Sequence, residues 1–256
     1  MTSTPALVRP AATLLLLRDA PQFEVLMVRR HRQIDFAGGA LVFPGGKVEP
    51  SDAELSPSLL VGAQSLDADD RHARIAAVRE TFEESGVLLA VDADGAVCRP
   101  SDELDAARAS LAVCQGFAEM LEALGVRLDL TTLTPFARWI APAVVPKRYD
   151  RRFYLADAPE DQLAACDGAE TVDAEWIAPS EALRLGETCE RTIIFPTRLN
   201  LRLLAESGSA AEAIAAARLR PSVTVEPRIV LRDGERRLSL PADAGYGAVE
   251  EPFDFR

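Results

Sequence analysis

Short apolar runs alternate with polar segments along the 256-residue chain. ATLLLL (12–17) and FEVLMVRR (23–30) are two such runs, separated by Asp-Ala-Pro-Gln, and they predict a hairpin or two neighbouring β-strands. A further short strand is predicted at LVF (41–43), between two glycine pairs. Later strands are predicted at VLLAV (87–91), FARWIAP (136–142), RRFYLADA (151–158), DAEWIAP (173–179), PRIVL (227–231) and RRLSL (236–240).

Other segments repeat their apolar positions at helical spacing. Ile75, Val78 and Phe82 form one stripe within residues 71–85, at intervals of three and four residues. The same periodicity predicts further helices in 101–124 with a break at Gln115-Gly116, in SEALRL (180–185), and in 196–219 with a break at 207–209.

Strands interrupted by helices predict one large layered domain of the α/β or α+β class, alone or with an added lobe. Residues 47–70 are polar and rich in Pro, Ser and Asp, and predict a long loop with room for a short helix. Leu199, Leu203 and Leu204 form a stripe near the C-terminus. We expect this stripe to dock either on the sheet or on a second subunit, which would make a homodimer.

Charge and composition narrow the classes of function. The formal net charge is −12, and a field of that sign repels nucleic-acid backbones and anionic membranes. The apolar run at 11–17 is too short to cross a bilayer, and no signal-peptide pattern accompanies it, so we expect a soluble cytoplasmic protein. The four cysteines are scattered and neither histidine lies near them, which argues against a soft-metal site or a disulfide framework.

The stretch RETFEESGV (79–87) places Glu80, Glu83 and Glu84 within one arc of a helix, opposite the apolar stripe. Like charges at this spacing, close to the end of a helix, are mutually unfavourable. A hard divalent cation such as Mg²⁺ would remove the penalty, because it prefers carboxylate oxygens. The alternative is a solvated acidic face.

A second stretch, FPGG (43–46), ends in two glycines and is followed by Lys47. Paired glycines allow the backbone to approach a ligand closely, although most such pairs are turns. Lys47 and Arg30 are candidate phosphate contacts, because an acidic protein needs local cations to hold a polyanion. Either side chain is alternatively an ordinary surface charge.

Together these stretches resemble the Nudix hydrolase signature, G-x5-E-x7-R-E-U-x-E-E-x-G-U, where U is a bulky apolar residue. Residues 79–87 match its second half, and FPGG is similar to the approach to its first glycine, Gly46. The segment between that glycine and Arg79 is about 19 residues longer than in the pattern. The slot eight residues before Arg79 holds Arg71 instead of Glu, and Asp69 or Asp70 is the expected substitute.

The resemblance implies an α+β fold, an α/β/α sandwich with a mixed β-sheet between helices. It implies a domain at 8–195 whose signature is split by the insertion 47–70, with C-terminal helices and tail (196–256) packed on the same domain. It also implies hydrolysis of a small nucleoside diphosphate derivative with Mg²⁺ or Mn²⁺, without nucleic acid or membrane.

The resemblance also implies roles for individual residues. The implied metal ligands are Glu80, Glu83, Glu84 and the Gly45 carbonyl. Glu80 is alternatively the base that takes a proton from water, and Arg79 holds a glutamate in place. Glu170, six residues before Trp176, is either a further ligand or base, or a surface charge on a loop.

The long insertion, RETFEESGVLL, and the segment 139–154 resemble the coenzyme A diphosphatases of the X-motif-19 type. This implies coenzyme A or acyl-coenzyme A as substrate, although Asp35 stands where the coenzyme A signature has an arginine. ADP-ribose or a nucleotide sugar, and a sensor that binds a ligand without cleaving it, are the alternatives. Arg148, with Tyr149, Asp150 and Arg152, is expected in a substrate loop or in surface ion pairs.

Overall fold

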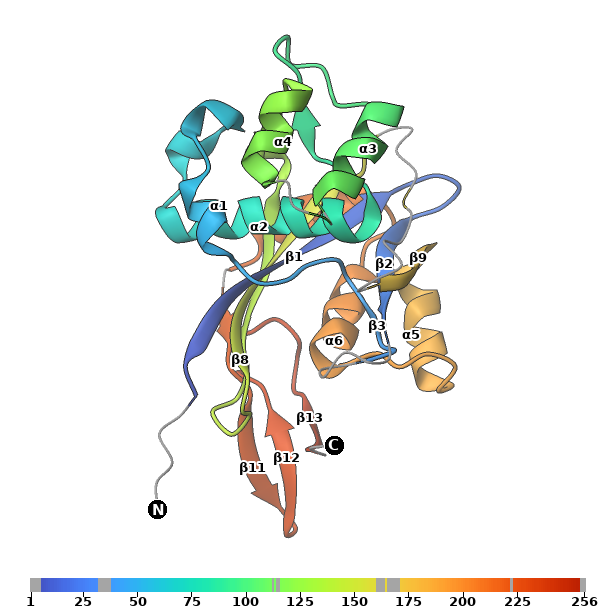
Figure 1. Ribbon diagram of the computed structural model, residues 1–256. Coiled ribbons are helices and arrows are strands. Elements are labelled where there is room, and N and C mark those ends of the chain that lie inside the picture. The colour runs from blue at the N-terminus through green and yellow to red at the C-terminus, as the bar shows by residue number, and fades with distance from the viewer. Residues whose placement is uncertain are drawn as a thin grey trace.

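The computed structural model describes residues 6–31, 38–111, 113, 116–159, 164, 171–221 and 223–253. A seven-stranded sheet lies at the centre of the molecule, in the order β10-β7-β8-β1-β2-β3, and β9 also pairs with β2 (Figure 1). Its strands are β1 (Val8–Arg18), β2 (Glu24–Arg30), β3 (Leu41–Val42), β7 (Thr134–Ile140), β8 (Arg148–Asp157), β9 (Thr171–Ile177) and β10 (Thr224–Val225).

The sheet mixes parallel and antiparallel pairs. β1 and β2 are antiparallel, with Leu17 opposite Val25, which confirms the hairpin expected from the two apolar runs. β1 and β8 are parallel over their whole length, with Ala11 opposite Arg151, and β8 is antiparallel to β7. The predicted α+β fold with a mixed sheet is therefore confirmed.

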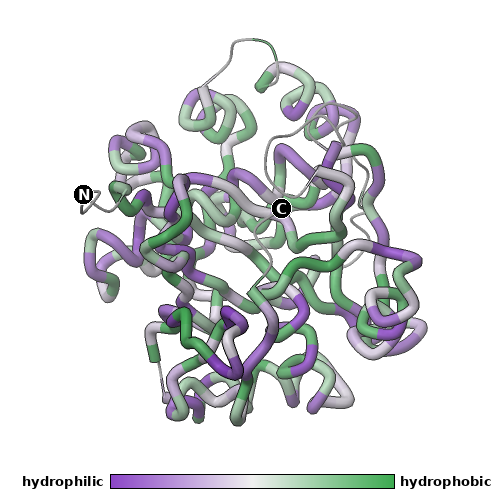
Figure 2. The backbone as a smooth tube through the Cα atoms, turned by 90° about the horizontal axis from the view of Figure 1, so that it is seen from below, coloured by the Kyte–Doolittle hydropathy of each residue, from purple (hydrophilic) through white to green (hydrophobic). Residues whose placement is uncertain are grey.

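Helices cover both faces of the sheet. Side chains alternate between the faces along each strand, so an apolar strand presents apolar side chains on both faces. On β1, Leu14 and Leu16 belong to the buried cluster that includes α2 (Ala68–Ser85). Leu15 and Leu17 belong to a second cluster on the opposite face. Figure 2 shows the hydrophobic positions gathered along the central strands, whereas the outer helices are mixed.

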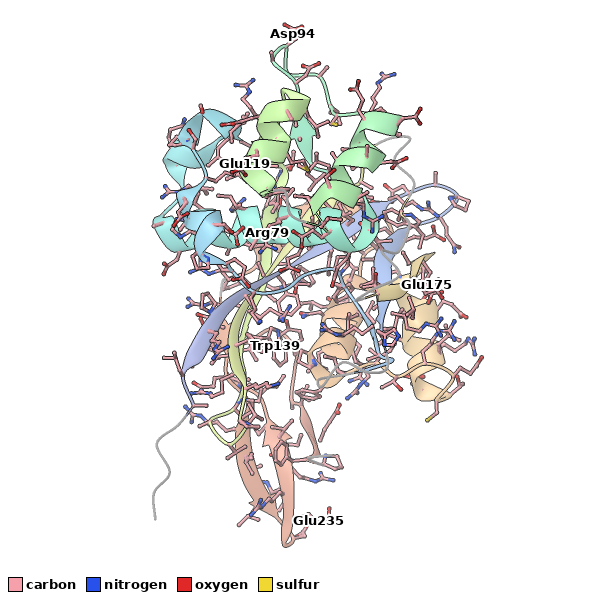
Figure 3. The ribbon with its side chains drawn as sticks, in the orientation of Figure 1. Arg79, Asp94, Glu119, Trp139, Glu175 and Glu235 are labelled. Carbon is pink, nitrogen blue, oxygen red and sulfur yellow. The ribbon has the colours of Figure 1, made fainter. Side chains whose placement is uncertain are left out.

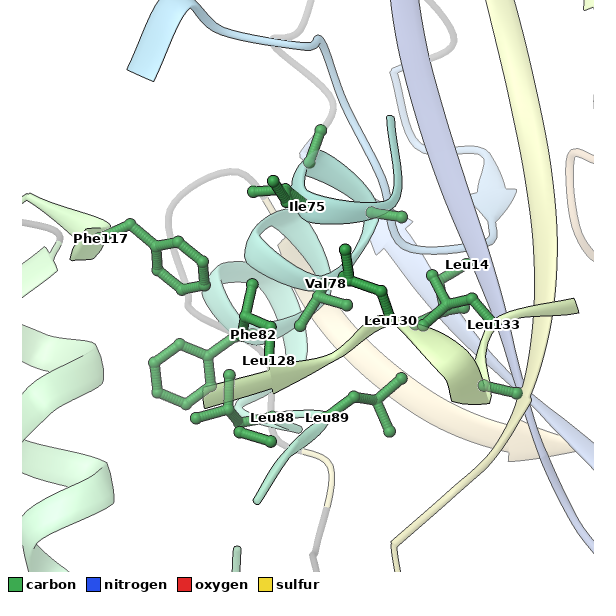
Figure 4. Packing of buried hydrophobic residues seen from close by; sticks show 14 of the residues in the cluster. Leu14, Ile75, Val78, Phe82, Leu88, Leu89, Phe117, Leu128, Leu130 and Leu133 are labelled. Atoms are coloured by element: carbon green, nitrogen blue, oxygen red, sulfur yellow. The ribbon is translucent and has the colours of Figure 1, made fainter. Parts of the chain in front are cut away.

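α2 packs on the sheet through the stripe predicted from the sequence. Ile75, Val78 and Phe82 are all buried in the cluster that also contains Leu14 and Leu128 (Figure 4). The helix ends at Gly86, whose φ is 77° and whose N–H donates to the Phe82 carbonyl at 2.8 Å. A left-handed residue of this kind is best supplied by glycine, which explains why the helix stops there.

The segment predicted as a long loop contains ordered elements. It forms α1 (Pro50–Glu54), two 3-10 turns, η1 (Pro57–Leu59) and η2 (Ala63–Ser65), and β4 (Leu60–Val61). β4 pairs with β6 (Arg127–Asp129), which also pairs with β5 (Ala90–Val91), in a small separate sheet. Above α2 this region is completed by α3 (Asp102–Leu111), α4 (Phe117–Leu124) and η3 (Leu130–Thr132) (Figure 1).

The C-terminal part covers the other face of the sheet and then projects from it (Figure 1). It consists of α5 (Pro179–Glu187), α6 (Phe195–Leu204), α7 (Ala210–Leu219), and a meander of β11 (Arg228–Arg232), β12 (Glu235–Ser239) and β13 (Glu250–Pro252). Leu199, Leu203 and Leu204 are buried in the cluster that contains Leu15 and Met27. Of the two alternatives for this stripe, the structure shows docking on the sheet of the same chain. Within the described residues, no helix combines the length and hydropathy needed to cross a membrane.

Candidate active site

The FPGG stretch runs alongside β1 as an irregular extra strand. Ala12 N–H donates to the Gly46 carbonyl at 2.9 Å, and Val48 N–H donates to the Pro10 carbonyl at 3.1 Å. Gly45 has a φ of 147°, and a Cβ there would lie 2.6 Å from Thr13 Cα. Only glycine fits at this position, because the two backbones approach so closely.

Two of the three glutamates converge on this glycine pair. Gly45 N–H donates to Glu84 Oε2 at 2.9 Å, and a Cβ on Gly46 would overlap the Glu80 carboxylate. Glu83 lies farther out, with 39% of its side chain exposed. The expectation of one exposed acidic face is wrong for Glu84, which is 5% exposed, because the glycine segment lies directly over it.

Arg79 fixes the acidic residues from the middle of α2 (Figure 3). Its Nη1 donates to Glu80 Oε1 at 3.0 Å and to Glu83 Oε2 at 3.4 Å, and its Nη2 donates to the Lys47 carbonyl. Burial alone would lower the pKa of Arg79, but the hydrogen bond with Asp52 and the surrounding carboxylates outweigh it and raise this pKa. Arg79 therefore stays charged and holds Glu80, as the resemblance implies.

Asp52 is a site residue that the sequence reading missed. Arg79 donates Nε to Asp52 Oδ1 at 2.8 Å and Nη2 to Oδ2 at 3.0 Å, a bidentate pair that is almost fully buried. Asp52 is the sixth residue after Gly46, which is the glutamate position of the signature counted forward from the glycine. Counting backward from Arg79 gave Arg71 because the extra residues lie between Asp52 and Arg79.

The proposed substitutes for this acid were wrong. Asp70 accepts hydrogen bonds from the Tyr154 hydroxyl at 2.7 Å and from Arg74 Nε at 2.8 Å, and thus ties α2 to β8. Asp69 is exposed at the start of α2. It lines a cavity of about 330 Å³, together with Val8, Pro10, Ala11, Val48, His72, Ala73, Asp150 and Arg152.

The three predicted substrate contacts lie in different surroundings. Lys47 is exposed beside the glycine pair. Arg30 is partly buried, and its Nε is a buried donor without a hydrogen-bond partner in the part of the chain that the structure describes. Arg148 donates to the Ala141 carbonyl at 2.9 Å and to Glu226 at 2.7 Å. Those contacts give Arg148 a structural role and do not support its assignment to the substrate. Glu170 and Asp35 lie outside the described residues.

Arg151 is a second residue that the sequence reading did not single out. Its Nη1 donates to the Thr13 hydroxyl at 2.7 Å. Burial, followed by the charge of Arg30, lowers the pKa of Arg151, while the charges of Glu80 and Glu84 act in the opposite direction. Arg151 therefore lies within electrostatic reach of both the glutamates and Arg30.

The acidic residues match a hard divalent cation in chemistry, since all of them offer carboxylate oxygens. Among the residues described here, no three Asp, Glu, His or Cys side chains stand close enough to hold an ion jointly. Instead, the Glu80 and Glu83 carboxylates accept hydrogen bonds from Arg79, and the Glu84 carboxylate accepts one from the Gly45 N–H. The carboxylates that could bind a metal are thus gathered around one glycine pair, but in this structure they are hydrogen-bonded to protein groups.

Comparison with known proteins identifies the family. A model of the NUDT19 Nudix domain matches residues 62–202, more than half of the chain, and a NUDIX domain model matches residues 7–104. The crystal structure of a NUDIX hydrolase from Alicyclobacillus acidocaldarius is similar, with 31% identity and a TM-score of 0.72, over 82% of this chain and 96% of that one.

Curated relatives carry the same domain. Acyl-coenzyme A diphosphatase NUDT19 of Xenopus laevis is 26% identical over 209 residues, covering 64% of this chain and 55% of its own length. The Homo sapiens protein of that name is 26% identical over 207 residues, again covering 64% and 55%. The chain thus spans about half the length of these curated relatives. On the matched domain and the arrangement around Gly45 and Gly46, the chain belongs to the Nudix hydrolases, in the branch of the NUDT19 Nudix domain.

Proposed function

We propose that the chain hydrolyses the pyrophosphate linkage of a nucleoside diphosphate derivative, and that coenzyme A or acyl-coenzyme A is its substrate. The observation that carries the proposal is the convergence of Glu80 and Glu84 on the Gly45–Gly46 pair, with Arg79 locked beside them. A solvated acidic helix face does not explain why Arg79 is buried beside the glutamates and paired with Asp52.

Nudix hydrolases generally use divalent metal ions. In this chain Mg²⁺ or Mn²⁺ would be held by Glu80, Glu83, Glu84 and the Gly45 carbonyl. When bound, such an ion would supply charge neutralisation at the phosphates and a more acidic water. Arg79 keeps Glu80 and Glu83 oriented through its two Nη1 contacts. Glu80 is positioned at Gly46 as a ligand or as the acceptor of the proton released from water.

The reaction would consume one water molecule. The water oxygen forms a bond to one phosphorus, the bridging P–O bond breaks, and the departing phosphate oxygen keeps the electron pair. From coenzyme A the products would be 4′-phosphopantetheine and adenosine 3′,5′-bisphosphate. The relatives named acyl-coenzyme A diphosphatase support this substrate.

ADP-ribose or a nucleotide sugar is the second candidate substrate, favoured by Asp35 in place of the arginine of the coenzyme A signature. The full chain would be incubated with Mg²⁺ or Mn²⁺ and coenzyme A, 3′-dephospho-coenzyme A, ADP-ribose or UDP-glucose, and the products identified by mass spectrometry. Faster cleavage of coenzyme A than of its 3′-dephospho form supports the proposal. Faster cleavage of ADP-ribose or UDP-glucose assigns the second candidate, and a ligand-induced thermal shift without any product indicates a sensor.

A further inference from the structure

Arg151 lies on the face of β8 that points away from α2. Its neighbour Arg152 and also Tyr154 contact Asp70 on α2. Side chains alternate along a strand, so Arg151 points to the opposite face. There it reaches across to β1 and donates to Thr13, whose side chain is buried.

Thr13 connects this arginine to the glycine pair. A Cβ on Gly45 would lie 2.9 Å from Thr13 Oγ1, the same oxygen that accepts the Arg151 hydrogen bond. The guanidinium of Arg151 is therefore one hydroxyl group away from Gly45, whose N–H in turn contacts Glu84. Only Nη1 of Arg151 is used in the hydrogen bonds between described residues, which leaves Nε and Nη2 for a ligand.

Arg30 adds a second positive charge within electrostatic range of Arg151. It acts on Arg151 by charge repulsion, and its own Nε is buried without a partner within the described ranges. Repulsion between two partly buried guanidinium groups is unfavourable, and a buried donor without a hydrogen-bond partner adds to the cost. A bound anion would remove both penalties.

We propose that Arg151, seated on Thr13, contacts the pyrophosphate of the substrate together with Arg30. The inference rests on the proposed function. The carboxylates of α2 would hold the cation, and the two arginines would donate hydrogen bonds to the phosphate oxygens. Arginine suits this task because its planar fork donates two parallel hydrogen bonds to phosphate oxygens. Thr13 is a positioning residue that acts through Arg151.

A purely structural role for Arg151, as a counter-ion for Glu80 and Glu84, makes a different prediction. Loss of a counter-ion would leave diphosphate affinity unchanged and would ease the binding of a metal cation. The test is therefore calorimetric titration with methylenediphosphonate in Mg²⁺, which measures binding without turnover. A separate titration with Mn²⁺ alone measures the metal.

The variants are Arg151→Gln, Thr13→Val and, as a matched control, Arg138→Gln. Arg138 lies on the neighbouring strand, pairs with Asp150 at 2.8 Å, and shares the opposite face with Arg152. We expect Arg151→Gln to weaken methylenediphosphonate binding about tenfold or more, since a hydrogen bond to a charged group has that worth. Thr13→Val should weaken it several-fold, and Arg138→Gln should match the wild type.

Binding by Arg151→Gln within about twofold of the wild type would overturn the inference. If circular dichroism shows that this variant does not fold, Thr13→Val decides, and unchanged binding by it overturns the inference. If the wild type hydrolyses a substrate and Arg151→Gln binds methylenediphosphonate as tightly as the wild type does, only the role of Arg151 is refuted. If the wild type neither hydrolyses any of the substrates nor binds methylenediphosphonate, the proposed function is refuted as well.

Discussion

Replacement of Asp52 by Asn tests whether the acid that follows Gly46 holds the site together. The Asp52 side chain is 1% exposed and that of Arg79 is 8% exposed. Asp52 receives two hydrogen bonds from Arg79 and one from the Glu49 N–H at 2.7 Å. An asparagine amide keeps one acceptor oxygen but turns an NH₂ group toward a guanidinium that only donates.

The magnitude follows from the burial of the pair. Breaking a buried ion pair by neutralising one partner costs about 3–5 kcal/mol, because the other charge is left uncompensated. Glu80 and Glu83 also contact Arg79 and compensate part of its charge. We therefore expect the lower end of the range, a loss of about 3 kcal/mol in the free energy of unfolding. That is a large share of the stability of about 5–15 kcal/mol typical of a domain.

Urea unfolding at pH 7 measures the loss. A double-mutant cycle with Arg79→Met isolates the pair, and the double variant should be hardly less stable than Arg79→Met alone. Asp69→Asn is the matched control, because Asp69 is exposed at the start of α2 and should lose less than about 1 kcal/mol. Equal losses for the Asp52 and Asp69 variants, or additive losses in the cycle, would refute the reasoning.

Three further changes probe the helix that carries the glutamates. Gly46→Ala should displace the Glu80 carboxylate and lower the hydrolysis rate about 100-fold. The control Gly208→Ala should leave the rate unchanged, and equal rates for the two variants would contradict the placement of Glu80. The pKa of Asp70 is lowered because hydrogen bonds from Tyr154 and Arg74 outweigh burial, so its stabilisation is present above the ordinary value of 3.8 and is lost as pH falls below it. Asp70→Asn should therefore unfold at lower urea than the wild type at pH 7, with a smaller difference at pH 3, and a gap independent of pH would argue against this. Arg108→Ala removes two hydrogen bonds to the Glu83 carbonyl, at 3.1 and 2.8 Å, and should lower the free energy of unfolding by about 1 kcal/mol, as measured in thermal melts. Arg108→Lys should have a stability between those of the wild type and Arg108→Ala, and no change in either variant would exclude a capping role for Arg108.

The sequence predicted the long elements because their periodicity is strong. The two strands at 12–17 and 23–30 and the stripe of Ile75, Val78 and Phe82 lie where the pattern placed them. The two-residue strand β4 was not predicted, because it is too short to show any alternation, and of the strand predicted at 87–91 only β5 is formed. Their pairing with β6 exists only through tertiary contacts.

The site was predictable where its residues are close in sequence. Glu80, Glu83, Glu84 and Arg79 stand within one helix, and the glycine pair was recognisable beside them. The partner of Arg79 was missed because 27 positions separate it from Asp52, across a segment of unusual length. Arg151 was missed because it meets Thr13 across 138 positions, through the parallel register of β1 and β8.

The most direct test of the account is the rate of pyrophosphate hydrolysis by Glu84→Gln beside the wild type, in Mg²⁺, with coenzyme A or whichever related substrate the wild type cleaves fastest. The glutamine oxygen can still accept the Gly45 hydrogen bond, so the fold should persist, as circular dichroism and urea unfolding would show. Loss of the carboxylate should lower turnover by about 100-fold or more, because charge stabilisation at the phosphates is removed. Turnover by a folded Glu84→Gln close to that of the wild type would contradict the assignment of the glutamate cluster as the catalytic centre.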